Sequence, residues 1–102
     1  MELDTFVRHG LPLIAVIGND GAWTQIARGQ VELLGDDVAT QLGRTAFHAV
    51  ADALGARGLL LDDPSQVTST LRTARNLARS GQVVLVNAHI GVGEFRKGSL
   101  AM

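Results

Sequence analysis

The stretch Leu11–Trp23, LPLIAVIGNDGAW, decides the fold of this chain. Its residues 13–17 form an uninterrupted apolar run, which predicts a strand buried on both faces of a parallel sheet. Residues 18–21 (Gly-Asn-Asp-Gly) end the run abruptly and predict a turn. The carboxyl end of a buried parallel strand is where open α/β sheets place ligands, and the two glycines allow close approach to a ligand or a positive φ. The sequence therefore predicts a ligand-binding turn here.

The composition fits one modest globular domain. The chain has 102 residues, is 46% hydrophobic and carries a formal net charge of −1, which favours a packed core and indicates neither a nucleic-acid nor a membrane partner. It contains no cysteine, which excludes a disulfide scaffold and a cysteine-ligated zinc site. The acidic N-terminal residues show no signal-peptide pattern, so we expect a cytoplasmic protein.

The flanks of the turn predict helices. Glu2–His9 has a helical apolar spacing, and Gly10 is suited to end the helix. After the turn, Ala22–Leu34 predicts a second helix, although the glycine inside it weakens that prediction. Gly35–Gly43 is expected to form a loop or a short helix. Its adjacent Asp36 and Asp37 are interpreted as a solvated turn rather than a metal-binding pair.

Trp23 has two interpretations. We favour a core residue, because tryptophan is usually highly buried. The alternative is that its indole lines a substrate pocket beside the turn.

The middle of the chain predicts another helix. Thr45 is expected to be its N-cap and Gly55 its end. His48 has no partner that the sequence identifies, so we interpret it as a surface histidine.

The second half predicts strand, helix and strand. The strands are Gly58–Leu61 and Gln82–Ile90, and the helix between them begins with Asp63 as N-cap and Pro64 at the first helical position. Asn87 and His89 lie on the same face of the last strand and are interpreted as a polar strand terminus, with a place beside a site at the strand's end as the alternative. The expected buried stripe of the helix is Val67, Leu71, Ala74 and Ala78.

Strands that alternate with helices imply an α/β fold with parallel pairing and right-handed crossovers. We expect a three-layer αβα arrangement with a small parallel sheet. The last strand should be central, and the short strand Gly58–Leu61 should lie at an edge. The tail from Gly91 is expected to be an irregular surface segment.

Three segments of the chain resemble the diphosphate-binding domain of thiamine-diphosphate-dependent enzymes. They read MELDTFVRHGLPLIAVIGNDGAW, LGRTAFHAVADALGARG and QVVLVNAHIG. The GND turn followed by a tryptophan, and the closing FRKGSLAM, are most similar to the acetolactate synthase-like and 2-hydroxyacyl-CoA lyase branch. The resemblance covers nearly the whole chain. It implies a partial thiamine-diphosphate-binding fold, with the first strand beside the last and the middle strand outside.

The resemblance also implies a cofactor and a metal. Thiamine diphosphate would be held with Mg²⁺, to which Asn19 would give its side-chain oxygen and Gly21 its backbone oxygen. If the register is shifted by one residue, Asp20 takes the metal-binding role instead. The implied reaction makes or breaks a carbon–carbon bond next to a carbonyl. The cofactor-binding residues implied in this way are Gly18, Asn19, Asp20, Gly21, Ala22 and Trp23.

Two features of that family are missing from the sequence. It has no Gly-Asp-Gly motif, whose aspartate would complete the metal shell, and it lacks the pyrimidine-binding domain with its activating glutamate. We therefore expect residues 1–102 to be a single partial domain, the carboxyl-terminal part of a longer enzyme and inactive alone. Its expected partners are the rest of that enzyme and a second copy of the chain. The competing hypothesis is a stand-alone, non-catalytic α/β binding module.

Overall fold

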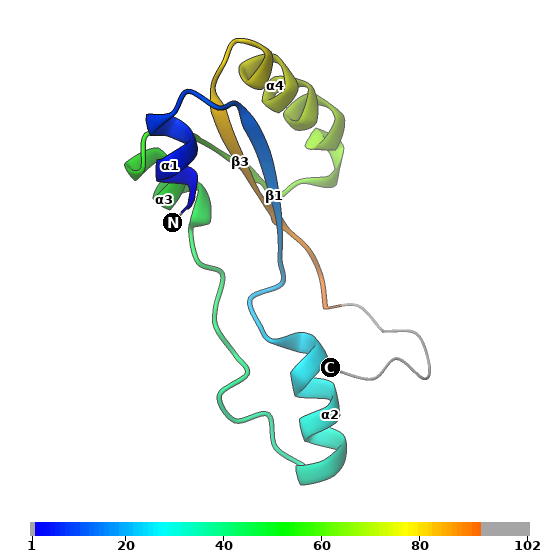
Figure 1. Ribbon diagram of the computed structural model, residues 1–102. Coiled ribbons are helices and arrows are strands. Elements are labelled where there is room, and N and C mark those ends of the chain that lie inside the picture. The colour runs from blue at the N-terminus through cyan, green and yellow to red at the C-terminus, as the bar shows by residue number, and fades with distance from the viewer. Residues whose placement is uncertain (1, 93–102) are drawn as a thin grey trace. The chain divides into compact units, whose positions relative to one another are not determined.

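A computed structural model describes residues 2–92 (Figure 1). The chain divides into two compact units: unit 1 comprises Met1–Gly18 and Ala46–His89, and unit 2 comprises Asn19–Thr45 and Ile90–Met102. The predicted surface tail with FRKGSLAM lies outside the described residues. Among the helices of residues 2–92, none combines the length and the apolarity needed to cross a membrane.

Unit 1 contains the sheet, and the described part of unit 2 contains a helix of 11 residues. The elements in chain order are α1 (Glu2–Arg8), β1 (Leu13–Asn19), α2 (Thr24–Leu34), α3 (Phe47–Ala53), β2 (Arg57–Leu61), the 3₁₀ turn η1 (Pro64–Gln66), α4 (Val67–Arg79) and β3 (Val83–His89). The predicted helices and strands are therefore all present. Residues 35–43 form a loop in which Asp36 and Asp37 are exposed, as expected.

The sheet has the predicted order, β1-β3-β2, with β3 in the centre. β2 pairs with β3 in parallel, in a register that runs from Arg57 opposite Val84 to Leu61 opposite Ala88. Helices α1 and α3 cover one face of the sheet and α4 covers the other (Figure 1). The predicted three-layer α/β architecture with a small parallel sheet is confirmed.

The core of unit 1 lies on both sides of β3. Val83 and Leu85 pack with Ala51 of α3 on one face, whereas Val84 and Val86 pack with Ala74 and Leu61 on the other face. β3, which was predicted to be the central strand, is therefore buried on both faces, as its unbroken apolar run favours.

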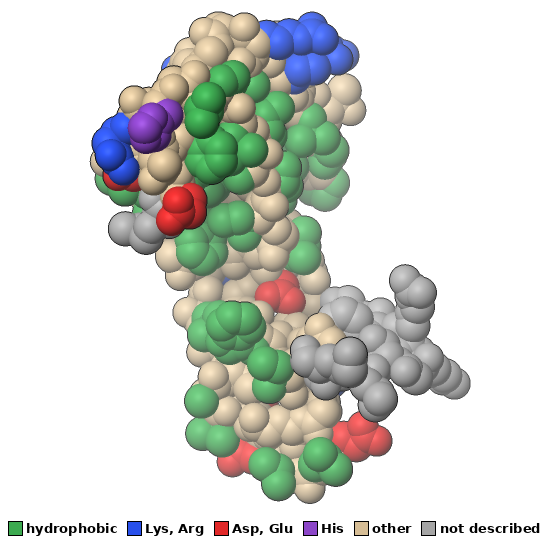
Figure 2. All heavy atoms as spheres, in the orientation of Figure 1, with side chains coloured by type: hydrophobic (Ala, Val, Ile, Leu, Met, Phe, Trp, Pro, Cys, Tyr) green, Lys and Arg blue, Asp and Glu red, His purple; other side chains and the backbone are tan. Residues whose placement is uncertain are grey.

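β1 does not behave like β3, and the prediction that both of its faces are buried is wrong. Leu13, Ala15 and Ile17 pack into the core shared with α1 and α3. On the opposite face, Ile14 is 39% and Val16 is 58% exposed. The reason is that α4 packs over β3 and β2, so that β1 has only one covered face. Figure 2 shows hydrophobic side chains that reach the surface over both units.

The start of α4 was predicted correctly, and its buried stripe was predicted correctly at Ala74 but not at Val67 and Leu71. The Asp63 side chain accepts a hydrogen bond from the Ser65 amide at 2.9 Å, as an N-cap should. Val67 and Leu71 are exposed, whereas Ala74 and Leu77 pack against the sheet. The helix is turned so that Ala74 and Leu77, rather than Val67 and Leu71, face the sheet.

The predictions for Thr45, His48 and Asn87 are corrected. α3 begins at Phe47, and its cap position, Ala46, makes no side-chain capping bond, so Thr45 is not the N-cap. His48 is half-buried, and its Nδ1 lies 3.2 Å from Nδ2 of Asn87. Asn87 is fully buried in the centre of the sheet, so this pair replaces the predicted surface histidine and polar strand terminus.

Candidate functional site

The predicted turn follows β1 directly and is held by the side chain of Asn19. This asparagine is only 5% exposed. Its Oδ1 accepts a hydrogen bond from the Gly21 amide at 3.1 Å, and its Nδ2 donates to the Thr45 carbonyl at 3.1 Å. One amide therefore closes the turn and also fixes the end of the loop that leads out of unit 2.

Asp20 is held by two donors that follow it in the chain. Its Oδ1 accepts from the Ala22 amide at 3.1 Å, and its Oδ2 accepts from the Thr24 hydroxyl. These bonds, the one from Thr24 first, lower the pKa of Asp20 below the ordinary aspartate value. Because the folded-state pKa is the lower one, this stabilisation is complete above the unfolded value of about 3.9 and is lost as the pH falls through the folded value. Asp20 is thus ionised at neutral pH.

Gly21 uses the conformational freedom expected of it. Its φ is +76°, and an added Cβ would lie 3.3 Å from both Cγ of Arg44 and the carbonyl carbon of Gly43. Its own carbonyl oxygen accepts hydrogen bonds from the amides of Leu42 (2.8 Å) and Gly43 (2.9 Å). The turn is therefore packed closely against the loop that returns to it.

Trp23 is not a core residue, and that prediction is wrong. The residue is 56% exposed, and the helix α2 that follows it has no buried residue that could form a core with the indole. Its backbone nevertheless joins the helix to the loop, because the Trp23 amide donates to the Thr40 carbonyl at 2.8 Å. The cavity described below has other lining residues, so the alternative that Trp23 forms a pocket wall stays a prediction.

Arg44 is a structural part of the site that sequence reasoning missed. Its guanidinium donates to the Asn19 carbonyl and to the Ile90 carbonyl, both at 2.9 Å. The Ile90 amide in turn donates to the Asn19 carbonyl at 3.1 Å. A single arginine after a glycine carries no pattern that would have revealed this role.

The turn can supply only part of a shell for a hard cation. Carboxylate and amide oxygens suit Mg²⁺, and each carbonyl oxygen has two lone pairs. Asn19 Oδ1 accepts the Gly21 amide, and the Gly21 carbonyl accepts two amides. Among residues 2–92, no group of three or more His, Cys, Asp and Glu could hold a metal ion.

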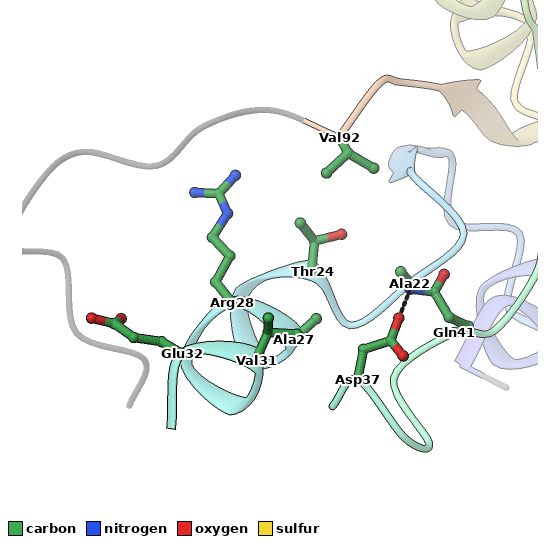
Figure 3. A pocket seen from close by; sticks show the side chains of 9 residues that line it. All are labelled: Ala22, Thr24, Ala27, Arg28, Val31, Glu32, Asp37, Gln41 and Val92. Carbon is green, nitrogen blue, oxygen red and sulfur yellow. Dashed lines mark hydrogen bonds between the residues drawn. The ribbon is translucent and has the colours of Figure 1, made fainter. Parts of the chain in front are cut away.

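A cavity of about 420 Å³ lies beside the turn within unit 2 (Figure 3). Ala22 and Thr24, which donate hydrogen bonds to Asp20 of the turn, also line the cavity. The remaining lining residues are Ala27, Arg28, Val31, Glu32, Asp37, Gln41 and Val92.

Comparison with known proteins gives consistent matches. Residues 1–88 match the family described as thiamine pyrophosphate enzyme, C-terminal TPP binding domain. The chain is 49% identical over 104 residues to a 2-hydroxyacyl-CoA lyase 2 of Mus musculus, which covers 100% of this chain and 16% of the relative. The corresponding values for the Danio rerio protein of the same name are 44% over 103 residues, 99% and 17%.

A more distant match is a probable acetolactate synthase of Mycobacterium bovis, 36% identical over 75 residues, with 72% of this chain and 14% of that protein covered. The chain spans about 16% of the length of the first curated relatives that it matches. With a match over residues 1–88, the chain belongs to the thiamine pyrophosphate enzyme family, as a C-terminal thiamine-pyrophosphate-binding domain.

Proposed function

We propose that residues 1–102 form part of the diphosphate-binding domain of a thiamine-diphosphate- and magnesium-dependent carboligase or lyase. The observation that carries the proposal is the turn after β1, where a buried Asn19 amide and an ionised Asp20 carboxylate lie side by side in the chain. The family match over residues 1–88 supports it. The turn would contribute the Asn-Asp-Gly half of the cofactor motif.

In this proposal, residues 18–23 contact the cofactor, and Asn19 and Gly21 give oxygens to Mg²⁺. The Asn19 side-chain oxygen is the first candidate ligand because its chemistry suits a hard cation, whereas the Gly21 carbonyl would have to give up one of its two hydrogen bonds. Asp20 is the alternative ligand, because each of its oxygens accepts one hydrogen bond and keeps room for another partner. When bound, the cofactor supplies a carbanion and holds the charge that develops next to the substrate carbonyl.

The substrate class follows the names of the relatives. Some are called 2-hydroxyacyl-CoA lyase 2 and others acetolactate synthase. A 2-hydroxyacyl thioester is the first candidate for this chain, since those relatives are the more similar ones, and a 2-oxo acid is the second.

The first prediction concerns the 102-residue chain alone. We expect no lyase or carboligase turnover and no micromolar binding of thiamine diphosphate with Mg²⁺, because the sequence has no Gly-Asp-Gly motif to complete the metal shell. Isothermal titration calorimetry with both ligands measures this. Micromolar binding by the isolated chain would contradict the expectation.

A chimera tests the proposed function directly. This chain would replace the matching segment of the mouse 2-hydroxyacyl-CoA lyase 2, to which it is 49% identical. We expect the chimera to retain thiamine diphosphate and to cleave a 2-hydroxyacyl-CoA. A chimera that folds, but neither retains the cofactor nor turns over, would favour the non-catalytic binding module instead.

The second prediction concerns self-association. β1 is an edge strand of the sheet in unit 1, and its Ile14 and Val16 are exposed. An edge with an apolar face is a template for pairing with another chain, and a twofold axis would let two copies cover each other. We expect a homodimer at micromolar concentration by multi-angle light scattering.

The control for the dimer is Val16→Lys, which places a charge on the exposed face of β1. This variant should run as a monomer with an unchanged circular dichroism spectrum. A wild-type chain with the mass of a single copy would rule out this interface.

A further inference from the structure

The cavity of unit 2 starts at the candidate cofactor turn and follows α2. Thr24, whose hydroxyl holds Asp20, lines the end next to the turn. Arg28 and Glu32 line it one and two turns further along the helix. Eight residues of α-helix correspond to about 12 Å, so the cavity accompanies the helix over roughly that length. In Figure 3, Thr24 and Arg28 extend from α2 toward the side on which Val92 lies.

The lining indicates the chemistry of the occupant. Its aliphatic part consists of Ala22, Ala27, Val31 and Val92, and the lining residues carry no aromatic ring. Its charged groups are two carboxylates and one guanidinium, so their formal sum does not favour an anion. The Asp37 carboxylate is engaged by the Gln41 amide at 3.1 Å. An uncharged aliphatic group fits this lining better than a phosphate or a carboxylate.

We propose that this cavity receives the aliphatic chain of the acyl substrate, with the reacting carbons at the end formed by Ala22 and Thr24. Val31, near the far end of the cavity wall along α2, would then limit the length of chain that is accepted. The identity of the ligand as a substrate rests on the function proposed above. A second apolar cavity, of about 340 Å³, lies in unit 1 and shares no residue with the turn, which makes it an internal comparison.

An NMR titration of the 102-residue chain tests the proposal without any cofactor. The probe is the uncharged N-acetylcysteamine thioester of 2-hydroxyoctanoic acid, followed through backbone amide signals. We expect saturable shifts at Thr24, Ala27, Val31 and Gln41. The corresponding thioester of 2-hydroxypropanoic acid should bind at least about tenfold more weakly, because it lacks most of the buried methylene groups.

Two matched variants make the test specific. Val31→Trp should fill the cavity and weaken binding of the octanoic probe at least about tenfold, with Ala27→Leu as a second filling variant if Val31→Trp does not fold. Leu33→Trp is the control, because Leu33 lies on the same helix, is 83% exposed and does not line the cavity. It should leave binding unchanged.

Three results would overturn the proposal: no shifts at millimolar probe, equal binding by the filling variants and the control, or shifts confined to the unit 1 cavity at residues such as Phe6 and Ile17. Since no thiamine diphosphate is present, this outcome is independent of cofactor loading by the chimera. Failure of one experiment is therefore distinguishable from failure of the other.

Discussion

Replacing Gly58 by alanine is expected to destabilise unit 1 so far that little folded protein remains. An added Cβ would lie 1.9 Å from the His48 carbonyl oxygen, 2.5 Å from its carbonyl carbon and 2.7 Å from its Cα. These are backbone atoms of α3, so no side-chain rotation relieves the clash. α3 and β2 would therefore have to move apart.

Several bonds depend on that close approach. The Gly58 amide donates to Oδ1 of Asp52 at 2.8 Å, and His48 lies against the buried Asn87. Overpacking costs typically about 1–3 kcal/mol and more where the neighbours are rigid, and small domains have only about 5–15 kcal/mol in total. We expect a loss of at least about 3 kcal/mol in urea unfolding followed by circular dichroism.

Gly29→Ala is the matched control for this prediction. Gly29 lies inside α2, and a Cβ added there meets nothing within 4 Å. Alanine should stabilise the helix by up to about 1 kcal/mol, because glycine is the poorer helix former. Equal unfolding midpoints for Gly58→Ala and the wild type would show that α3 does not press on β2 as described.

The second large effect is expected at Asn19. In the chimera with the mouse lyase, Asn19→Ala should weaken retention of thiamine diphosphate and Mg²⁺ by about 100-fold or more, since the metal loses an oxygen and the turn loses its closing bonds. The Gly21 amide and the Thr45 carbonyl would lose the partner that they now share. Each such loss costs about 1–3 kcal/mol when the group stays buried.

Two further variants test the register. Asn19→Asp keeps an oxygen for Gly21 and the metal but removes the donor to Thr45, so it should retain more cofactor than Asn19→Ala. Asp20→Ala should have a smaller effect, because it removes only the bonds to Ala22 and Thr24. Calorimetry with Mg²⁺ measures all three. A larger loss for Asp20→Ala than for Asn19→Ala would move the metal ligand to Asp20.

Local sequence patterns predicted the fold wherever the residues of a segment themselves determine whether it forms a helix, a strand or a turn. The apolar runs of β1 and β3 gave the strands, and Asp63 with Pro64 gave the start of the turn that leads into α4. The burial of those runs could not be read in the same way. β1 and β3 look alike in sequence, yet only β3 is covered on both faces, because coverage depends on where α4 packs.

The candidate site also has a part that the sequence predicts and a part that it does not predict. The turn and its oxygen donors follow from Asn19, Asp20 and Gly21 themselves. The Thr45 carbonyl and Arg44 lie 25 or more residues further along the chain, and no spacing rule connects them to the turn. The pairing of His48 with Asn87 spans 39 residues and was missed for the same reason.

The double acceptance at the Gly21 carbonyl has a thermodynamic consequence for ligand binding. With its amide, its carbonyl and the neighbouring side chains all bonded, the turn is ordered before any ligand arrives. Ordering a residue costs about 1–2 kcal/mol in conformational entropy. For Asn19, Asp20 and Gly21 this cost is met when the chain folds and not when a ligand binds. Affinity should therefore respond to changes in the loop at Leu42–Arg44, which contacts the turn but no ligand in the proposal, since one of the two amides on the Gly21 carbonyl must release it when that oxygen binds the metal.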